Sequence, residues 1–259
     1  MLEHDPAIEI EGLATDYAAG TWIEPHNHDA HQILHAAAGV FRVISEDAVW
    51  VVPPGRAIWM PADRVHAVRC HTATAMRTVY LDRTARGLPS DCAVWSISPL
   101  MREVLIRMAT VPDDPNWSHL LALLLAEIAE IDALPLALPQ PQDPRLRGMT
   151  AAILTEPADP RPLKAWSKEL GFSERNLIRK FADETGMTFR EWRRQARLLA
   201  ALERLAAGEP VTLAAFAVGY DNVSAFIEAF RDVFGTTPRR YFKSQEVSPL
   251  PATAAPRQG

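Results

Sequence analysis

The pattern of apolar residues changes at a short proline-rich stretch, and this change constrains the fold more than any other feature. LPLALPQPQDP, residues 134–144, holds four prolines and cannot form a helix. Before about Leu81 the chain consists of short apolar runs broken by Gly, Pro, Asp and Glu, whereas after residue 144 only helical patterns occur up to Phe242. We therefore expect a β-domain and an α-domain joined by a semi-rigid strap.

The N-terminal half is predicted to be all-β and to end in two helices. Between Ile8 and Leu81, seven or eight short runs rich in Val, Ile, Trp and Phe indicate a sandwich or barrel. Ser98-Pro99 has the form of a helix N-cap followed by proline, and a second helix is expected after Asn116. In WSHLLALLLAEIAEI the apolar residues cover more than one core-facing stripe. This helix therefore either forms a dimer interface or packs on both sides within the monomer.

Charge is divided unequally between the two halves. Residues 1–144 hold 9 Lys and Arg against 19 Asp and Glu, and residues 145–245 hold 17 against 12. The basic half is expected to contact a polyanion, with chance clustering of solvated charge as the alternative. Cys70 and Cys92 give no disulfide framework, and no apolar run is long enough to span a bilayer. These features predict a cytoplasmic protein with no membrane partner.

Two helices around a short turn are predicted in LKAWSKELGFSERNLIRKFADETG, residues 163–186. Gly171 ends the first helix, Ser173 caps the second, and Leu177 and Phe181 of the second face inward. Arginine suits guanine edges and lysine suits phosphates. The remaining surface of the second helix carries Arg175, Asn176, Arg179 and Lys180. This is the arrangement of a helix-turn-helix, although an ordinary charged helix face is the alternative.

The same layout recurs about fifty residues later, which argues against chance. TLAAFAVGYDNVSAFIEAFRDVFG, residues 212–235, has Gly219 at the turn and Asn222 as the cap. Phe226 and Phe230 occupy the inward positions of its second helix. The segment between the two units begins with a capping box, and its helix is roughly 28 Å long. Two readers at this separation could enter successive major-groove segments of DNA.

Residues 145–243, and above all RLLAALERLAAG, GYDNVSAFIEAFRDVFG and FGTTPRRYF, resemble the AraC-type (AraC/XylS) family of bacterial transcription regulators. The resemblance implies a seven-helix domain that binds promoter DNA and works with RNA polymerase. It makes Arg175, Ile178 and Arg179 the reading residues of the first helix, and Val223, Ser224 and Glu228 those of the second. Because the second set is poor in basic residues, we expect only backbone contact or weak readout there.

Four of the eight histidines lie in HNHDAHQILHAAAG, residues 26–39. If residues 26–32 run as one strand, His26, His28 and Gln32 share one face, and His31 and His35 share the other. The four histidines therefore cannot form one cluster. His31 and His35 are expected on the outer face of the sheet.

This stretch is also similar to the first motif of the cupin barrels, as Gly20, His26, His28, Gln32 and Gly39, with Gln where the motif has Glu. The second motif is matched at Gly55, Pro61 and His66, with Asp63 for Gly and Cys70 for Asn. The resemblance, over about residues 15–82, implies a site made of His26, His28, His66 and Gln32. Three imidazoles suit Zn, Ni, Cu or Fe. The alternative is a metal-free pocket in which these residues bind an organic effector, anionic or neutral because Gln32 carries no charge.

The sequence thus predicts a two-domain regulator. We expect a cupin-like sensor barrel at residues 1–97, a helical linker and dimerisation segment at 98–142, a double helix-turn-helix domain at 143–245 and a disordered tail at 246–259. Its expected function is transcription regulation at promoter DNA in response to a small-molecule or metal effector, as a homodimer and not as an enzyme. The rivals are a metal-dependent cupin enzyme, such as a dioxygenase, fused to DNA-binding helices, and an effector-independent structural DNA binder.

Overall fold

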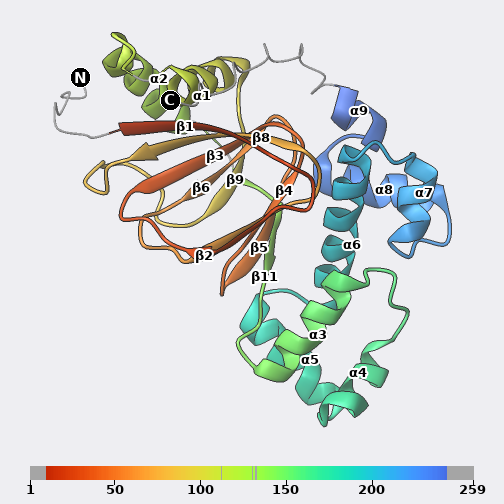
Figure 1. The fold of residues 1–259 in the computed structure, drawn as a ribbon. Coiled ribbons are helices and arrows are strands. Elements are labelled where there is room, and N and C mark those ends of the chain that lie inside the picture. The colour runs from red at the N-terminus through yellow and green to blue at the C-terminus, as the bar shows by residue number, and fades with distance from the viewer. Residues whose placement is uncertain (1–9, 112, 130, 132, 244–259) are drawn as a thin grey trace.

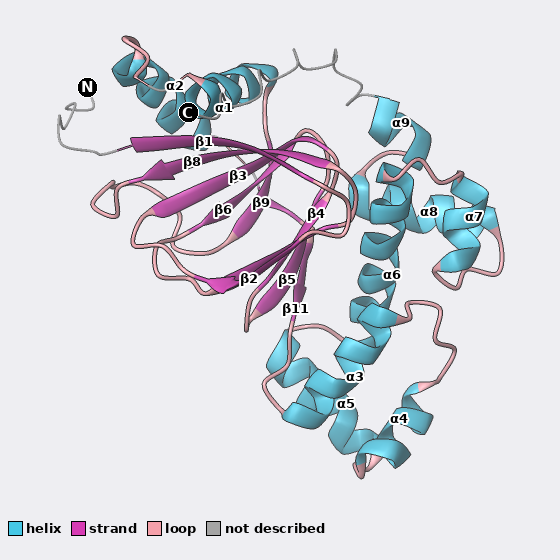
Figure 2. Ribbon diagram, viewed as in Figure 1, coloured by secondary structure: helices cyan, strands magenta, loops and turns pink. Residues whose placement is uncertain are grey.

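The computed structural model describes residues 10–243 except 112, 130 and 132, and its first half is a pair of antiparallel sheets packed face to face (Figure 1). Strands and helices fall into separate halves, apart from two helices beside the first sheet (Figure 2). The predicted tail at 246–259 lies outside the described residues. Within the described residues, no helix has the length and apolar character that crossing a membrane requires.

The six-stranded sheet has the order β1-β8-β3-β6-β9-β10, and the five-stranded sheet has the order β11-β5-β4-β7-β2. Their strands are β1 (Ile10–Tyr17), β2 (Trp22–His26), β3 (His31–Ala38), β4 (Phe41–Ile44), β5 (Ala48–Val52), β6 (Arg56–Met60), β7 (His66–Cys70), β8 (Thr74–Leu81), β9 (Ala93–Ser96), β10 (Ala133–Leu134) and β11 (Ala137–Pro139). The predicted β-domain is confirmed, with eight strands between residues 10 and 81.

Two helices cover the outer face of the six-stranded sheet (Figure 1). They are α1 (Pro99–Thr110) and α2 (Trp117–Ala129). The Ser98 side chain accepts a hydrogen bond from the backbone N–H of Met101, which confirms the predicted N-cap. The two helices and the sheet share one apolar cluster, in which Trp59 and Trp95 of the sheet are buried with Met101 and Leu105 of α1. This packing ties the helices to the β-domain.

The proline-rich segment, predicted as a semi-rigid strap between the domains, also contributes a short strand to each sheet. Its first end, β10, pairs with β9, and its second, β11, pairs with β5. The strap also accepts side-chain hydrogen bonds from the helical half. Trp192 Nε1 donates to the carbonyl of Pro139 at 2.7 Å, and Gln195 donates to the carbonyl of Ala137 at 2.7 Å. Strand pairing supplied by other segments thus orders a stretch that has little regular structure of its own.

The second half consists of seven described helices, as the family resemblance implies. They are α3 (Pro144–Thr155), α4 (Leu163–Leu170), α5 (Glu174–Thr185), α6 (Phe189–Ala206), α7 (Val211–Ala217), α8 (Val223–Phe234) and α9 (Pro238–Lys243). Both helix-turn-helix units are confirmed, as α4–α5 and α7–α8, and Leu177, Phe181, Phe226 and Phe230 are fully buried. The long α6 lies between the units and beside the five-stranded sheet (Figure 1). Its N-terminus carries the predicted capping box.

His31 and His35 point away from Gln32, as strand alternation predicts. The ring of His31 stacks on Trp59, with centroids 5.1 Å apart. His35 is fully buried, and its Nδ1 donates to the carbonyl of Arg56 at 2.9 Å. Burial lowers the pKa of His35 to about 4, against the opposing effect of that hydrogen bond.

We predict that this buried imidazole makes folding sensitive to acid. Between pH 6.5 and 4 the unfolded chain takes up a proton at His35 that the folded chain does not, so the free energy of unfolding should fall by about 3 kcal/mol from this group. Urea unfolding at pH 7 and pH 4 would measure the loss. His35→Gln, which keeps a donor but does not titrate, should lose correspondingly less. Equal losses in both proteins would contradict the assignment.

Candidate functional site

A histidine cluster forms where β2 ends and β7 begins. His26 is the last residue of β2 and pairs in register with His66, the first residue of β7. Residues 27–30 form a turn rather than a strand, so the premise that residues 26–32 run as one strand is wrong. The backbone N–H of Asp63 donates to the carbonyl of His28 at 2.8 Å and holds this turn against the loop before β7. His28 thus reaches His26 because the chain bends, not because side chains alternate.

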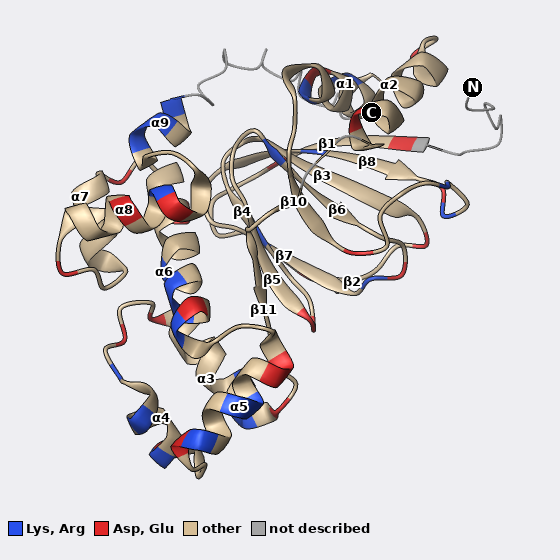
Figure 3. Ribbon diagram, turned by 180° about the vertical axis from the view of Figure 1, so that it is seen from behind, with Lys and Arg blue, Asp and Glu red and all other residues tan. Residues whose placement is uncertain are grey.

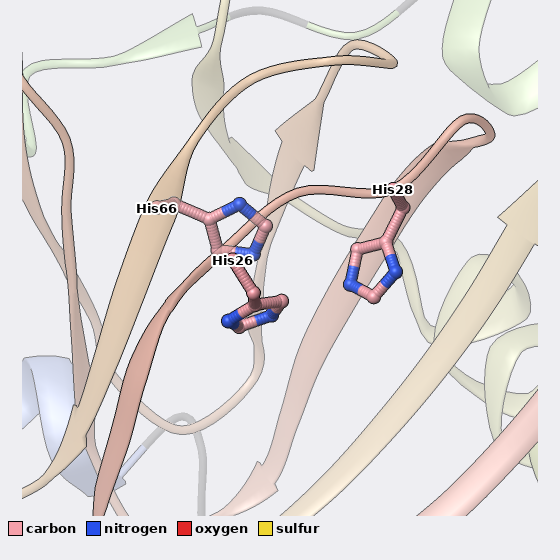
Figure 4. Close-up of side chains that lie close together, drawn as sticks. All are labelled: His26, His28 and His66. Atoms are coloured by element: carbon pink, nitrogen blue, oxygen red, sulfur yellow. The ribbon is translucent and has the colours of Figure 1, made fainter.

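The rings of His26, His28 and His66 lie close together and come from different elements (Figure 4). His31 and His35 contact other groups, the Trp59 ring and the carbonyl of Arg56. The centroid of His26 is 4.5 Å from that of His66 and 5.0 Å from that of His28. One ligand atom from each ring can be chosen so that all three lie within 4.8 Å of one another. Two nitrogens bound to one zinc ion at about 2.0–2.1 Å in tetrahedral geometry are about 3.4 Å apart, so the rings must move closer together to bind it. His26 and His28 are only half-buried, whereas His66 is buried.

Backbone carbonyls fix the tautomers of two of these rings. His26 Nδ1 lies 2.7 Å from the carbonyl oxygen of Glu24, and His66 Nδ1 lies 2.9 Å from that of Arg64. Because a carbonyl only accepts, both Nδ1 atoms must carry hydrogen, and in the neutral rings Nε2 holds the lone pair. Metal-binding histidines commonly have this orientation by an outer hydrogen bond.

Gln32 and Tyr80 complete the inner wall. Gln32 Nε2 donates to the Tyr80 hydroxyl at 3.2 Å, and the two residues lie opposite each other on β3 and β8. The buried acceptors Gln32 Oε1 and His66 Nε2 have no hydrogen-bond donor among the described residues. Tyr80 was missing from the sequence prediction because only the pairing of β3 with β8 brings it to Gln32.

Burial favours the neutral form of two imidazoles of the cluster, those of His28 and His66. Burial lowers the pKa of His66, and the neighbouring His26 and His28 lower it further. Burial, followed by the charge of His26, also lowers the pKa of His28. At neutral pH these two rings therefore offer lone pairs rather than charge.

A cavity of about 330 Å³ opens at the same end of the barrel, beside the loop that leads to His66. Trp50 contributes an aromatic wall, and burial raises the pKa of the Cys92 thiol to about 11, which keeps it protonated. The lining residues are Ser45, Glu46, Asp47, Trp50, Asp63, Arg64, Val65, Asp91 and Cys92. The space suits a small organic molecule.

The candidate DNA-contacting residues of the first unit lie on the open face of α5. Arg175, Asn176, Ile178 and Arg179 are exposed, and Ile178 is 50% exposed despite its apolar side chain. Neither arginine has an ion-pair partner among the described residues. Lys180 differs, because its ammonium group lies 2.6 Å from Glu184 and 3.5 Å from Asp143. The Ser173 hydroxyl accepts from the backbone N–H of Asn176 and thus caps the helix.

The second unit presents a less basic surface. Ser224 and Glu228 are exposed on α8, Val223 is half-buried, and the Asn222 side chain caps the helix by accepting from the N–H of Ala225 at 2.8 Å. Seen from behind, basic residues recur along α4, α5, α6 and α9 (Figure 3). The positive charge predicted for this half thus lies on several helices of one domain.

Two protein-family models match the chain. The model described as "AraC-like ligand binding domain" matches residues 8–139, and the one described as "Helix-turn-helix domain" matches residues 166–244. The chain is 33% identical over 238 residues to the HTH-type transcriptional regulator NimR of Escherichia coli, covering 90% of this chain and 87% of NimR. It is 32% identical over 107 residues to the regulator RipA of Corynebacterium glutamicum, covering 41% of this chain and 32% of RipA.

Solved structures are also similar to the chain. ToxT from Vibrio cholerae covers 90% of this chain and 98% of its own, with 10% identity and a TM-score of 0.40. The DNA-binding domain of AdpA, solved in complex with a target DNA, covers 40% of this chain and 93% of its own, with 23% identity and a TM-score of 0.37.

Proposed function

Since the chain belongs to the AraC family of transcription regulators, with an effector-binding domain and a helix-turn-helix DNA-binding domain, we propose that α5 supplies most of its sequence readout. The observation that supports this assignment is the exposure of Arg175 and Arg179, one helical turn apart and without intramolecular ion pairs among the described residues. Arginines so placed can reach base edges in a major groove. Ile178, between them, can contact a thymine methyl group.

We propose a smaller role for α8. Ser224 can reach a phosphate or a base, but the exposed carboxylate of Glu228 repels the DNA backbone unless it meets a cytosine amino group. Ser173 and Asn222 cap their helices and are expected to act through helix geometry. Lys180, held by Glu184, is available to a phosphate only if that ion pair opens.

We predict that Arg179→Ala weakens binding to the target promoter by about 1–3 kcal/mol, because a bidentate contact to guanine is lost. Glu228→Ala on α8 is the comparison and should change the affinity much less. Mobility-shift titrations at fixed salt, on the promoter and on random DNA, measure both. A loss at Arg179 that is equal on the two DNAs would make it a phosphate contact, and a larger loss of specificity at Glu228 would reverse the ranking of the helices.

We propose that the histidine cluster binds a divalent transition metal, of the series Zn, Ni, Cu or Fe. The supporting observation is that Gln32 Oε1 and His66 Nε2 are both buried electron-pair donors without a partner among the described residues. An anion brings only further acceptors, so it does not complement these atoms by itself. A metal ion does, with His26, His28 and His66 as ligands and Gln32 as a neutral oxygen donor. In a metal-free protein the same atoms would require an effector that donates hydrogen bonds.

We propose that the barrel binds its effector without converting it. The metal, when bound, would supply a Lewis acid, but the described site adds no carboxylate beside Gln32 to act as a base. The test is to incubate metal-loaded protein with small organic acids and alcohols under oxygen. Saturable binding without turnover is the expected result, and steady turnover would establish the cupin-enzyme alternative.

We propose that α2 mediates a homodimer and that RNA polymerase is the further partner through which promoter binding acts. Leu121, Leu124 and Ile128 of α2 are buried against α1 and the sheet, yet Leu123 on the other side is 42% exposed. Ala122 and Ala126 extend this outer apolar face.

We predict that Leu123→Glu shifts the full chain from dimer to monomer at micromolar concentration, because it places a charge in the apolar contact. Sedimentation velocity reports the change, with Leu213→Glu on exposed α7 as the control that should leave the state unaltered. A dimer that persists in Leu123→Glu would place the interface elsewhere.

A further inference from the structure

The outer face of the five-stranded sheet carries a concentration of positive charge that faces the helical domain. Arg42 on β4 and Arg69 on β7 lie directly opposite each other in the antiparallel register, and His71 follows the end of β7. Like charges in opposed positions on one face of a sheet destabilise it. Among the described residues, the ion pair of Arg42 goes to Glu203 of α6, and His71 Nε2 lies close to the same carboxylate.

Glu203 is the counterpart of this charge in the other domain. Its two oxygens accept from Arg42, Oε1 from Nε at 2.9 Å and Oε2 from a terminal nitrogen at 2.6 Å, and His71 Nε2 lies 3.3 Å from Oε1. The residue is 7% exposed. A carboxylate this deeply buried is unfavourable without hydrogen-bonding partners, and the partners here come from the barrel. We call Arg42, His71 and Glu203 the Glu203 cluster.

The contact around the cluster is incompletely packed. A cleft of about 450 Å³ lies beside it, lined by residues of both domains that include Arg69, Thr155 and Arg204. The N-terminal half of α6 is held separately, by the hydrogen bonds of Trp192 and Gln195 to the strap. The C-terminal half of α6 contacts the β-domain through the Glu203–Arg42 ion pair.

Strand β7 connects the cluster to the candidate effector site. His66 begins this five-residue strand and faces the histidine cluster, and His71 follows its last residue at the opposite end. The strand is about 17 Å long and rigid through its pairing with β2 and β4. A displacement of His66 along the strand axis therefore moves His71 relative to Glu203.

We propose that the Glu203 cluster is an interdomain latch that fixes the orientation of the DNA-binding domain on the sensor barrel. It clamps the outer face of β4 and β7 to the helix that spaces the two reading units. Opening it removes the ion pair between α6 and the barrel. The strap, the ion pair of Arg147 with Glu46 and the contact of Arg56 with the Tyr241 ring then remain, and the helical domain can reorient more freely. The proposal of a latch depends on the contacts between the two domains. Only the further proposal, that the latch responds to the histidine cluster, depends on the proposed metal site.

The orientation can be measured in the full chain with two spin labels. Glu11→Cys on β1 and Lys168→Cys on α4 are exposed positions in the two domains. Cys92 is replaced by serine, and fully buried Cys70 is retained. Pulsed dipolar spectroscopy without metal should give one narrow distance distribution, and Glu203→Gln should broaden it at least twofold. Glu209→Gln, which removes an acid paired with Arg204 within the helical domain, is the matched control and should leave the width unchanged.

Arg42→Met tests the same contact from the barrel side. It should broaden the distribution as much as Glu203→Gln does, and the double variant should add nothing further, because both remove one contact. Far-ultraviolet circular dichroism and thermal melting confirm that each variant is folded. Folded single variants with the wild-type distance distribution would overturn the latch. A latch confirmed by these variants but unchanged by added Ni²⁺ would instead refute its link to the histidine cluster.

Discussion

Replacing His66 by alanine should lower the affinity for a divalent metal by at least about a hundredfold, because losing even an outer-shell partner costs metal sites about 10–100-fold. Among the candidate ligands, His66 is the best placed to bind a metal ion. It is 2% exposed, its tautomer is fixed by the carbonyl of Arg64, and its Nε2 has no donor among the described residues. Isothermal titration with Ni²⁺ and elemental analysis of protein purified without an affinity tag would measure the effect.

His119→Ala is the control for this experiment, because His119 is exposed on α2 and its loss should leave bound metal unchanged. His31 is a poor control, since its Nδ1 accepts from the N–H of Ala62 in the loop that leads to His66. If neither the wild-type protein nor the variant binds metal while effector binding persists, the histidines form the walls of an organic-ligand pocket instead.

Gly12→Ala should lower the free energy of unfolding by about 3 kcal/mol, the upper part of the range for overpacked positions. A Cβ atom at this position of β1 would lie 1.8 Å from the carbonyl oxygen of Met108 and 2.7 Å from its carbonyl carbon. Both are backbone atoms of α1, so no side-chain rotation relieves the overlap. The strand and the helix must separate, and the apolar cluster between them must loosen.

Gly148→Ala in α3 should instead raise the free energy of unfolding, because a Cβ at this position would meet nothing within 4 Å. Alanine should stabilise this helix by about 0.5–1 kcal/mol relative to glycine. Urea unfolding of both variants under one set of conditions compares them. A Gly12→Ala protein as stable as the wild type would show that β1 does not pack closely on α1.

The sequence predicted the elements whose signals are local. Ser98, Thr188 and Asn222 cap the helices that they were expected to cap, and the inward residues of both helix-turn-helix units are buried, because caps and helical periodicity depend on a few neighbouring residues. The strap was predicted as a connection, since its pairing with β5 and β9 depends on strands more than thirty residues away.

In the candidate site, too, local sequence signals were predicted correctly and contacts between distant segments were not. The motif spacing selected His26, His28, Gln32 and His66, and the structure brings the three histidines together. The assumed strand across residues 26–32 was wrong because the turn at 27–30 is held by a bond to Asp63, which local alternation does not reveal. Tyr80 and Glu203 were missed for a related reason. Each acquires its role from a partner that only tertiary structure supplies, Gln32 for one and Arg42 for the other.

The pairing of β10 and β11 bears on how such regulators exchange parts during evolution. One short segment supplies an edge strand to each of the two sheets, β10 to one and β11 to the other. A recombination that joined a new DNA-binding domain directly after β9 would therefore remove both edge strands. A crossover between Pro139 and Asp143 would transfer the sheets whole. Even there, the incoming reader would have to bring its own equivalents of Trp192 and Gln195. The unit that can be exchanged is therefore the sensor domain together with the residues of the neighbouring helix that bind its last strand.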